Sequence, residues 1–320
     1  GGGPAGWGGA IAVVPYEMYK IYGDKETFRR YLPKILRYFD YLDSRSSGGL
    51  VCREEEGGWC LGDWCPPEQI TICEPFVNTA LYVKQMMMTK EASEAIGESE
   101  TAAMLEKRIE EKKQAILNAY YSPQTGSFIG DAQGANSFAV DIGLGGERAF
   151  NNTKKKYDAA DAFDTGIFGT DILIRVLFER GCADTAFRLL TSTGKGSFYN
   201  MKKQGATTIW ENWDGERSHS HPMFGAVTRY LFSFILGITQ EKNSAGYEKI
   251  VIAPQIPDGL NRASGHITTV RGEIAVSFVR TEREMDFYVT VPQKAWFTYG
   301  SDCEYELWEG ENHIHIDFEE

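Results

Sequence analysis

The sequence predicts a mainly α protein, part of an α/α toroid, followed by a C-terminal antiparallel β-sandwich. Up to about residue 237, apolar side chains recur at the spacing of amphipathic helices. From about Tyr247 onward, they alternate with polar side chains, as in strands with one buried face. We therefore expect a helical domain at residues 1–240, with its N-terminal part missing, and a sandwich domain at residues 247–320.

Seven helices are expected, at residues 11–22, 25–43, 71–88, 91–120, 171–180, 183–191 and 223–236. In the second, Phe28, Leu32 and Ile35 follow the helical period, and Pro33 is expected to kink or restart the helix. Residues 44–70 are rich in Gly, Pro and acids, which predicts a long functional loop. The polar run 151–161 predicts a solvated surface turn. Helices paired in this way, with long loops on one side, indicate a toroid.

Strands are expected at residues 250–256, 274–279, 287–291, 296–299 and 314–318. In the second of these, Ile274, Val276 and Phe278 alternate with Ala275 and Ser277. The polar turn 281–284 separates it from the third strand, where the alternation resumes. The expected linker between the domains covers residues 240–246.

The composition excludes some partners. The net charge of −12 argues against nucleic acid or an anionic membrane, because both attract basic surfaces. No apolar run reaches the length of a membrane span. The aromatic share of 13%, together with this acidity, favours a protein that handles carbohydrate. The compartment stays open, with a periplasmic or secreted location preferred.

Four of the six cysteines lie within residues 52–73. Their spacings differ from the paired spacing of structural zinc sites, and no histidine is nearby. We therefore expect free thiols and no metal site.

The strongest candidate site lies in residues 205–214, where Glu211 stands between Trp210 and Trp213. Aromatic walls around one carboxylate suit a sugar, because rings stack on C–H faces and the carboxylate handles hydroxyls or water. The alternative is a β-segment of the core in which the glutamate caps a neighbouring helix.

Three further clusters could join this site. Trp7 is embedded in glycines, Asp63 lies between Trp59 and Trp64, and the turn 165–170 carries Gly166 and Gly169. Each has a structural alternative: a hydrophobic staple, an Asx-turn in a packed loop, and a helix N-cap, respectively. In a toroid, however, loops of this kind converge on one funnel, which favours an active site.

The order of these motifs resembles that of the bacterial α-L-rhamnosidases. The resemblance covers nearly the whole chain and rests on six segments: Gly6–Ala10, Tyr22–Asp24, Gly62–Trp64, Thr165–Thr170, Gly205–Asp214 and His221–Ala226. It implies an (α/α)6 barrel followed by a β-sandwich. It also implies hydrolysis of terminal α-L-rhamnose from glycosides or polysaccharides, with inversion and without metal or cofactor.

The resemblance also implies roles for particular residues. The general base falls on Glu211, the stacking tryptophans on Trp7 and Trp64, and the sugar-binding histidine on His221. From the residues themselves, Asp63, Trp210 and Trp213 are expected to be walls or supports of the sugar site. We expect His219 to be a bystander.

Two departures from the family pattern bear on the mechanism. Family members often carry an acidic residue where Gly9 stands. The family's general acid lies in a segment upstream of the Trp7 motif, and no such segment precedes Trp7 here. Residues 53–63 are similar to that segment but follow Trp7 in the sequence instead of preceding it. Glu55 and Glu56 are therefore only minor candidates for the general acid. We therefore expect the C-terminal portion of a longer enzyme, with its general acid upstream and without assured activity of its own.

Other functions remain open at this point. One is a different (α/α)-barrel glycosidase or a phosphorylase, although no phosphate-binding loop accompanies Glu211. Another is a non-catalytic carbohydrate-binding protein, which would not need both Glu211 and His221. A purely structural helical scaffold leaves the tryptophan-bearing loops unexplained.

Overall fold

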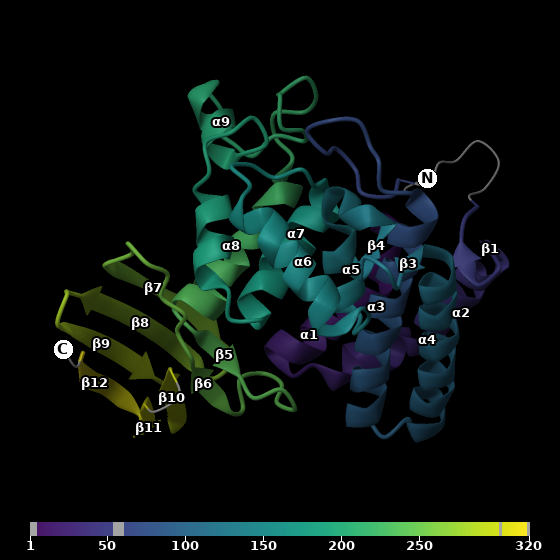
Figure 1. The fold of residues 1–320 in the computed structure, drawn as a ribbon. Helices are drawn as coiled ribbons and strands as arrows, with labels where there is room; N and C mark the ends of the chain where they lie inside the picture. Colours follow the sequence, from purple (N-terminus) through teal and green to yellow (C-terminus); the bar gives the residue numbers. More distant parts are fainter. Residues whose placement is uncertain (1–4, 54–60, 301–302, 319–320) are drawn as a thin grey trace.

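The computed structural model describes residues 5–53, 61–300 and 303–318. A helical part is followed by a smaller two-sheet part that lies to one side of it (Figure 1). This confirms the fold class expected from the sequence.

The helices form pairs arranged as an incomplete ring. The inner helices are α1 (Ala10–Tyr22), α3 (Glu74–Ala95), α5 (Ala135–Asp141) and α7 (Ile167–Glu179). Each contacts the next inner helix and packs against an outer one: α2 (Lys25–Ser44), α4 (Ser99–Tyr120), α6 (Gly146–Asp158) or α8 (Ala183–Leu190). The 3-10 segment η3 (Pro222–Thr228) continues the inner ring after α7.

The outer helix α2 shows how the sequence specifies these pairs. Asp24 caps its N-terminus by accepting a hydrogen bond from the Thr27 backbone N–H at 2.9 Å. Its apolar side chains, spaced three and four residues apart, are buried against the inner helices. The helix runs through Pro33, which lies on the exposed side, so the expected restart there is wrong.

Three other expectations for the helical part are corrected. The break expected near residue 90 lies instead around Gly97, whose positive φ of 86° ends α3. Residues 151–158 belong to α6, because Phe150 and Tyr157 are buried while the intervening lysines face solvent. The expected helix 223–236 is divided between η3 and a π-helical turn, η4 (Leu231–Ile235).

The shorter elements connect the helices. The helix α9 (Phe198–Lys203), which was not expected, precedes the Glu211 segment. The others are η1 (Trp7–Gly9), β1 (Ser46–Ser47), β2 (Leu50–Val51), β3 (Tyr121–Ser122), β4 (Ser127–Phe128) and η2 (Ile129–Gly134).

The C-terminal part consists of two four-stranded sheets, ordered β11-β10-β6-β5 and β12-β9-β8-β7. Their strands are β5 (Ile238–Gln240), β6 (Ile250–Ile252), β7 (Arg262–Thr269), β8 (Gly272–Arg280), β9 (Glu284–Val291), β10 (Ala295–Tyr299), β11 (Cys303–Leu307) and β12 (Gly310–Asp317). All neighbours pair antiparallel except β6 and β10, which pair in parallel. Phe278, Phe287 and Phe297 pack between the sheets, with ring centroids 4.9–5.9 Å apart.

The strands β7 and β11 were not expected from the sequence. Both are edge strands. Because β7 buries none of its residues fully, its sequence needs no regular alternation of apolar and polar residues, and the strand signal is weak. The sheet also begins earlier than expected, because β5 pairs with β6 ahead of the expected linker at 240–246.

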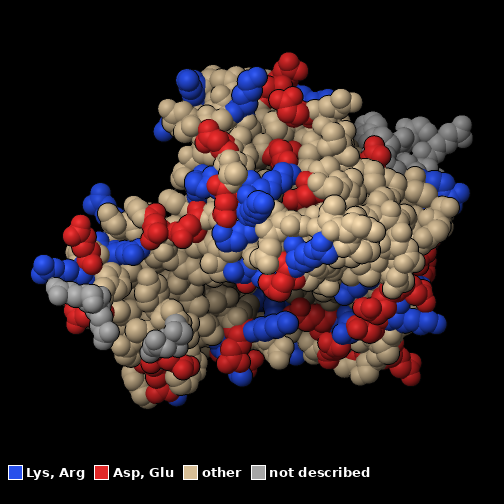
Figure 2. All heavy atoms as spheres, in the orientation of Figure 1, with Lys and Arg blue, Asp and Glu red and all other residues tan. Residues whose placement is uncertain are grey.

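Acidic and basic side chains are interspersed over the face of the molecule shown in Figure 2. Among the described residues, no helix combines the length and the apolar character that crossing a membrane requires.

Candidate active site

The N-terminus of α7 is the point where the candidate motifs meet. The carboxylate of Asp63 accepts hydrogen bonds from the backbone N–H groups of Gly166, Phe168 and Gly169, at 2.7, 3.0 and 2.9 Å. The backbone carbonyl of Trp64 accepts a fourth, from Ile167, at 2.8 Å. The N–H groups in the first turn of a helix have no acceptor within the helix. The loop that carries Asp63 supplies these acceptors for α7.

Two glycines make this approach possible. A Cβ atom at Gly166 would lie 2.3 Å from the carbonyl oxygen of Trp64. A Cβ atom at Gly169 would lie 2.4 Å from Oδ2 of Asp63. The motif at residues 165–170 therefore has glycine at the two positions where the loop touches α7.

Asp63 is completely buried, and both of its oxygens are engaged by the backbone. Burial raises its pKa to about 7, although the three hydrogen bonds oppose this shift. A carboxyl in this position cannot reach a ligand. Of the two roles expected for Asp63, a wall of the sugar site or a support of it, this burial fits the second.

Glu211 is held by Trp64, the residue after this cap. The indole Nε1–H of Trp64 donates a hydrogen bond to Oε1 of Glu211 at 3.3 Å. The backbone N–H of Ser218 donates to Oε2, also at 3.3 Å, and the Glu211 backbone pairs with Ser218 across the same loop. The capping loop and the Glu211 loop, 147 residues apart, are thus joined through one carboxylate.

These contacts determine the ionisation of Glu211. Partial burial raises its pKa, but hydrogen bonds from Trp64 and Ser218 and the nearby His221 and Arg217 outweigh it. The net result is a pKa below the ordinary value for glutamate, so the side chain is an ionised acceptor at neutral pH.

Two basic side chains complete this part of the site. The guanidinium of Arg217 lies 5.0 Å from the ring centroid of Trp64, which is a cation–π distance. His221 is anchored by its backbone N–H to Ile209, and its buried Nδ1 has no partner among the described residues. The sequence analysis missed Arg217, because a lone arginine in a polar loop carries no motif.

The two tryptophans beside Glu211 differ in their surroundings. Trp213 is 2% exposed, stacks on Phe163 and donates its indole N–H to the carbonyl of Thr165 at 3.2 Å. Trp210 is 6% exposed and stacks on the ring of His219, with centroids 4.5 Å apart. Both tryptophans therefore hold the loop in place, and His219 contributes to this packing.

Trp7 reaches the same region indirectly. It is partly buried, and its ring lies 5.2 Å from that of Phe168, in the first turn of α7. Phe168 in turn is bound through its backbone to Asp63. Trp7 thus lies beside the helix end that organises Trp64 and Glu211, without a direct contact to either among the described interactions.

A hollow of about 280 Å³ lies along the axis of the ring, between α1, α3, α5, α7 and the η3 region. Gly6, Phe168 and Met223 are among its lining residues, whereas Trp64, Glu211 and His221 are not. Its wall carries paired charges: Asp141 binds Lys84 at 2.8 Å and Arg175 at 2.7 Å. The hollow adjoins the Trp7 side of the site.

The remaining candidates are placed as follows. Glu55 and Glu56 lie outside the described residues. The five described cysteines are free thiols, as expected. One of them, Cys65, follows Trp64, and burial raises the pKa of its thiol to about 12, so it stays protonated and is a poor nucleophile at neutral pH.

Removing the carboxylate of Asp63 tests its capping role. We expect Asp63→Ala to lower the free energy of unfolding by roughly 3 kcal/mol, because three buried N–H groups lose their acceptor. The matched control is Asp24→Ala, which removes the partly exposed cap of α2 and should cost about 1 kcal/mol. Urea denaturation measures both, and equal losses in the two variants would contradict the role.

Replacing Trp64 tests its effect on Glu211. In Trp64→Phe the indole hydrogen bond to the carboxylate is lost, so the pKa of Glu211 should rise toward the ordinary value of about 4.3. Carboxyl-carbon NMR of glutamate-labelled protein measures this shift. Trp7→Phe is the control and should leave the pKa of Glu211 unchanged. An unchanged pKa of Glu211 in Trp64→Phe would show that the indole hydrogen bond does not lower this pKa.

The chain matches two domain families of known proteins. Residues 1–235 match the family described as the bacterial alpha-L-rhamnosidase 6 hairpin glycosidase domain, and residues 237–297 match the bacterial alpha-L-rhamnosidase C-terminal domain. An alpha-L-rhamnosidase of Alteromonas sp. (strain LOR) is 26% identical over 90% of this chain and 33% of its own length. One of Streptomyces avermitilis is 28% identical over 86% of this chain and 26% of its own length.

Solved structures show the same fold. The Streptomyces avermitilis alpha-L-rhamnosidase complexed with L-rhamnose superposes with a TM-score of 0.85 and 22% identity, covering 98% of this chain and 33% of that one. The alpha-L-rhamnosidase from Dictyoglumus thermophilum gives a TM-score of 0.87 and 18% identity, covering 99% and 40%. The chain thus spans about a third of the length of the curated relatives it matches. It belongs to the bacterial alpha-L-rhamnosidase family, whose six-hairpin glycosidase domain accounts for most of its residues.

Proposed function

We propose that the protein carrying these residues hydrolyses terminal α-L-rhamnosides with inversion, and that Glu211 is its general base. The observation that carries this proposal is the ionised Glu211, held by Trp64 and Ser218 in a chain of the rhamnosidase family. The relative from Streptomyces avermitilis that was solved with L-rhamnose supports the choice of sugar.

The contacts of Glu211 suit a base that activates water. One hydrogen bond to each oxygen fixes the plane of the carboxylate and leaves a lone pair on each oxygen. A water molecule bound there can transfer a proton to Glu211 as its oxygen attacks the anomeric carbon. Because the pKa of Glu211 is lowered, the base is ready at neutral pH but loses activity in acid.

An inverting mechanism needs a second carboxyl about 6.5–9.5 Å away to protonate the leaving oxygen. Asp63 is unsuitable, because it is completely buried and bound to three N–H groups of the backbone. We assign the general acid to a carboxyl outside residues 1–320, as the motif order implies.

The sugar contacts follow from the free surfaces of the site. The face of Trp64 not covered by Arg217 can stack on the C–H face of rhamnose. His221 is only partly buried, so its ring can bind a sugar hydroxyl through the nitrogen other than the buried Nδ1. Trp7 would form the opposite wall, beside Phe168. Trp210, Trp213 and Asp63 are assigned to the support of these contacts, since all three are buried.

Replacing the base tests the proposal. In the protein that carries these residues, Glu211→Gln should lower kcat on an aryl α-L-rhamnoside by at least about 10²-fold, the usual weight of a general base. Binding of L-rhamnose, measured by calorimetry, should change by only a few fold. The matched control is Asp214→Asn, in the same loop. Its exposed carboxylate accepts one hydrogen bond among the described residues, from the Glu216 backbone N–H, and the variant should keep near wild-type rates.

The outcomes separate the alternatives. A Glu211→Gln enzyme at wild-type rate would refute the assignment of the base. A wild-type protein that binds rhamnose but cleaves no member of a panel of aryl glycosides would indicate a binding protein. Cleavage of another glycoside in preference to the rhamnoside would indicate a glycosidase of different specificity.

A pH profile of the same reaction provides a further test. Activity should require ionised Glu211, so kcat/KM falls as pH drops through its pKa. In Trp64→Phe this pKa rises, so the acid limb of kcat/KM should move to higher pH. An acid limb that stays in place while the NMR pKa moves would assign the limb to another group.

A further inference from the structure

A group of histidine and acidic side chains lies on the sandwich, outside the candidate active site. It is carried by β9 and the edge strand β12, which pair antiparallel. Three cross-strand pairs bring these side chains to one face: Glu284 with Asp317, Asp286 with His315, and Tyr288 with His313. The residues between them on β9 point into the core instead.

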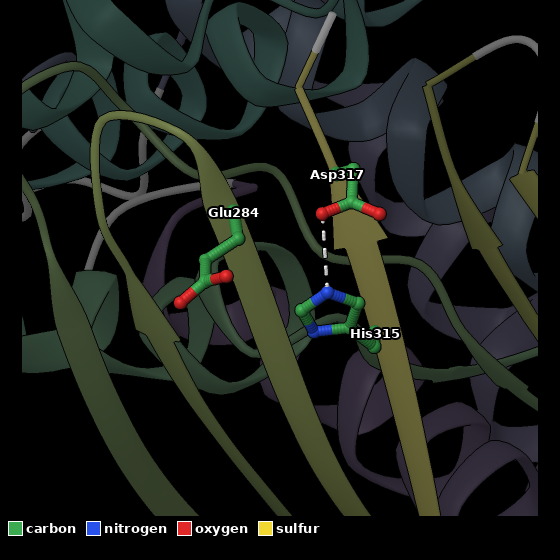
Figure 3. Close-up of side chains that lie close together, drawn as sticks. All are labelled: Glu284, His315 and Asp317. Carbon is green, nitrogen blue, oxygen red and sulfur yellow. Dashed lines mark hydrogen bonds and ion pairs between the residues drawn. The ribbon is translucent and has the colours of Figure 1, made fainter.

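Three of these side chains lie close together (Figure 3). One ligand atom from each of Glu284, His315 and Asp317 lies within 4.8 Å of the other two. Nε2 of His315 is 3.2 Å from Oδ1 of Asp317. An ion about 2.0–2.2 Å from each atom therefore needs only small side-chain rotations.

The other nitrogen of His315 is already oriented. Its Nδ1 lies 2.9 Å from Oδ1 of Asp286, and the same oxygen lies 2.7 Å from Nε2 of His313. A hydrogen bond from Nδ1–H to Asp286 leaves Nε2 free to bind a metal. Histidine ligands in metal sites usually have this carboxylate partner behind them.

The charges on this face also favour a cation. Glu284 and Asp317 are direct cross-strand neighbours, an arrangement in which like charges are destabilising. Within residues 5–53, 61–300 and 303–318, no lysine or arginine forms an ion pair with either of them or with Asp286. A divalent ion bound between the two carboxylates would remove this repulsion.

We propose that Glu284, His315 and Asp317 bind a divalent transition-metal ion, such as Zn²⁺, that clamps the edge strand β12 to β9. The imidazole ligand favours such ions over Ca²⁺ and Mg²⁺, which prefer oxygen ligands alone. Water completes a four-coordinate shell on the exposed side. Asp286 is a positioning residue that holds His315, and His313 in turn holds Asp286.

Titration of the metal-stripped protein with Zn²⁺ alone, by calorimetry, tests the site. Wild type should bind one equivalent that His315→Ala and Asp317→Asn lose or bind at least 10-fold more weakly. Asp286→Asn should weaken binding about 10–100-fold, because it frees the ring of His315. The matched control is His266→Ala, an exposed histidine on β7 of the same sheet, which should bind as wild type does.

Two further measurements make the result decisive. Without metal, Asp317→Asn should unfold at a higher temperature than wild type, because it removes the repulsion with Glu284. Excess Zn²⁺ should raise the unfolding temperature of wild type but not that of His315→Ala. Co²⁺ bound at this site should give no thiolate charge-transfer band, because all ligands are nitrogen or oxygen. Equal binding by wild type and His315→Ala, or a thiolate band that places the ion on the cysteines, would overturn the proposal.

Discussion

The contact between Asp63 and the first turn of α7 is the constraint on which the site depends. A helix end must find acceptors for its free N–H groups, and in a buried position water cannot provide them. Here a carboxylate from a loop about a hundred residues earlier fills that need. Once it does, the position of the following residue, Trp64, is fixed relative to α7.

The position of Glu211, the candidate catalytic group, depends on that contact. Trp64 binds Glu211, and the Glu211 loop is held from its other side by Trp213, which binds the Thr165 carbonyl just before α7. Both ends of the arrangement therefore return to the same helix turn. A base held within hydrogen-bonding distance by rigid neighbours pays little reorganisation cost during reaction. This explains why buried tryptophans surround a loop that is otherwise polar and exposed.

The two parts of the chain are stabilised in different ways. In the helical part, charges are paired inside the ring, as with Asp141 between Lys84 and Arg175, where an unpaired charge would be costly. In the sandwich, aromatic and aliphatic side chains fill the space between sheets, and charges gather on the outer face. Carboxylates on that face, beside an edge strand, have no lysine or arginine partner within the described part of the chain, and this is the feature that a metal ion would explain.

The sequence alone indicated that a run of helices precedes a run of strands, because periods of 3.6 and 2 are local and can be recognised without knowledge of the fold. It also placed Trp64 and Glu211 in one candidate site, since their glycine-rich and tryptophan-rich motifs are local too. Edge strands such as β7 and the helix at residues 146–158 were not predicted, because the burial of their side chains depends on which elements cover them. Only the tertiary structure decided that Asp63 is a buried helix cap, that Trp213 belongs to the core, and that Arg217 covers Trp64. Those roles arise from contacts between segments far apart in the chain, which no local pattern encodes.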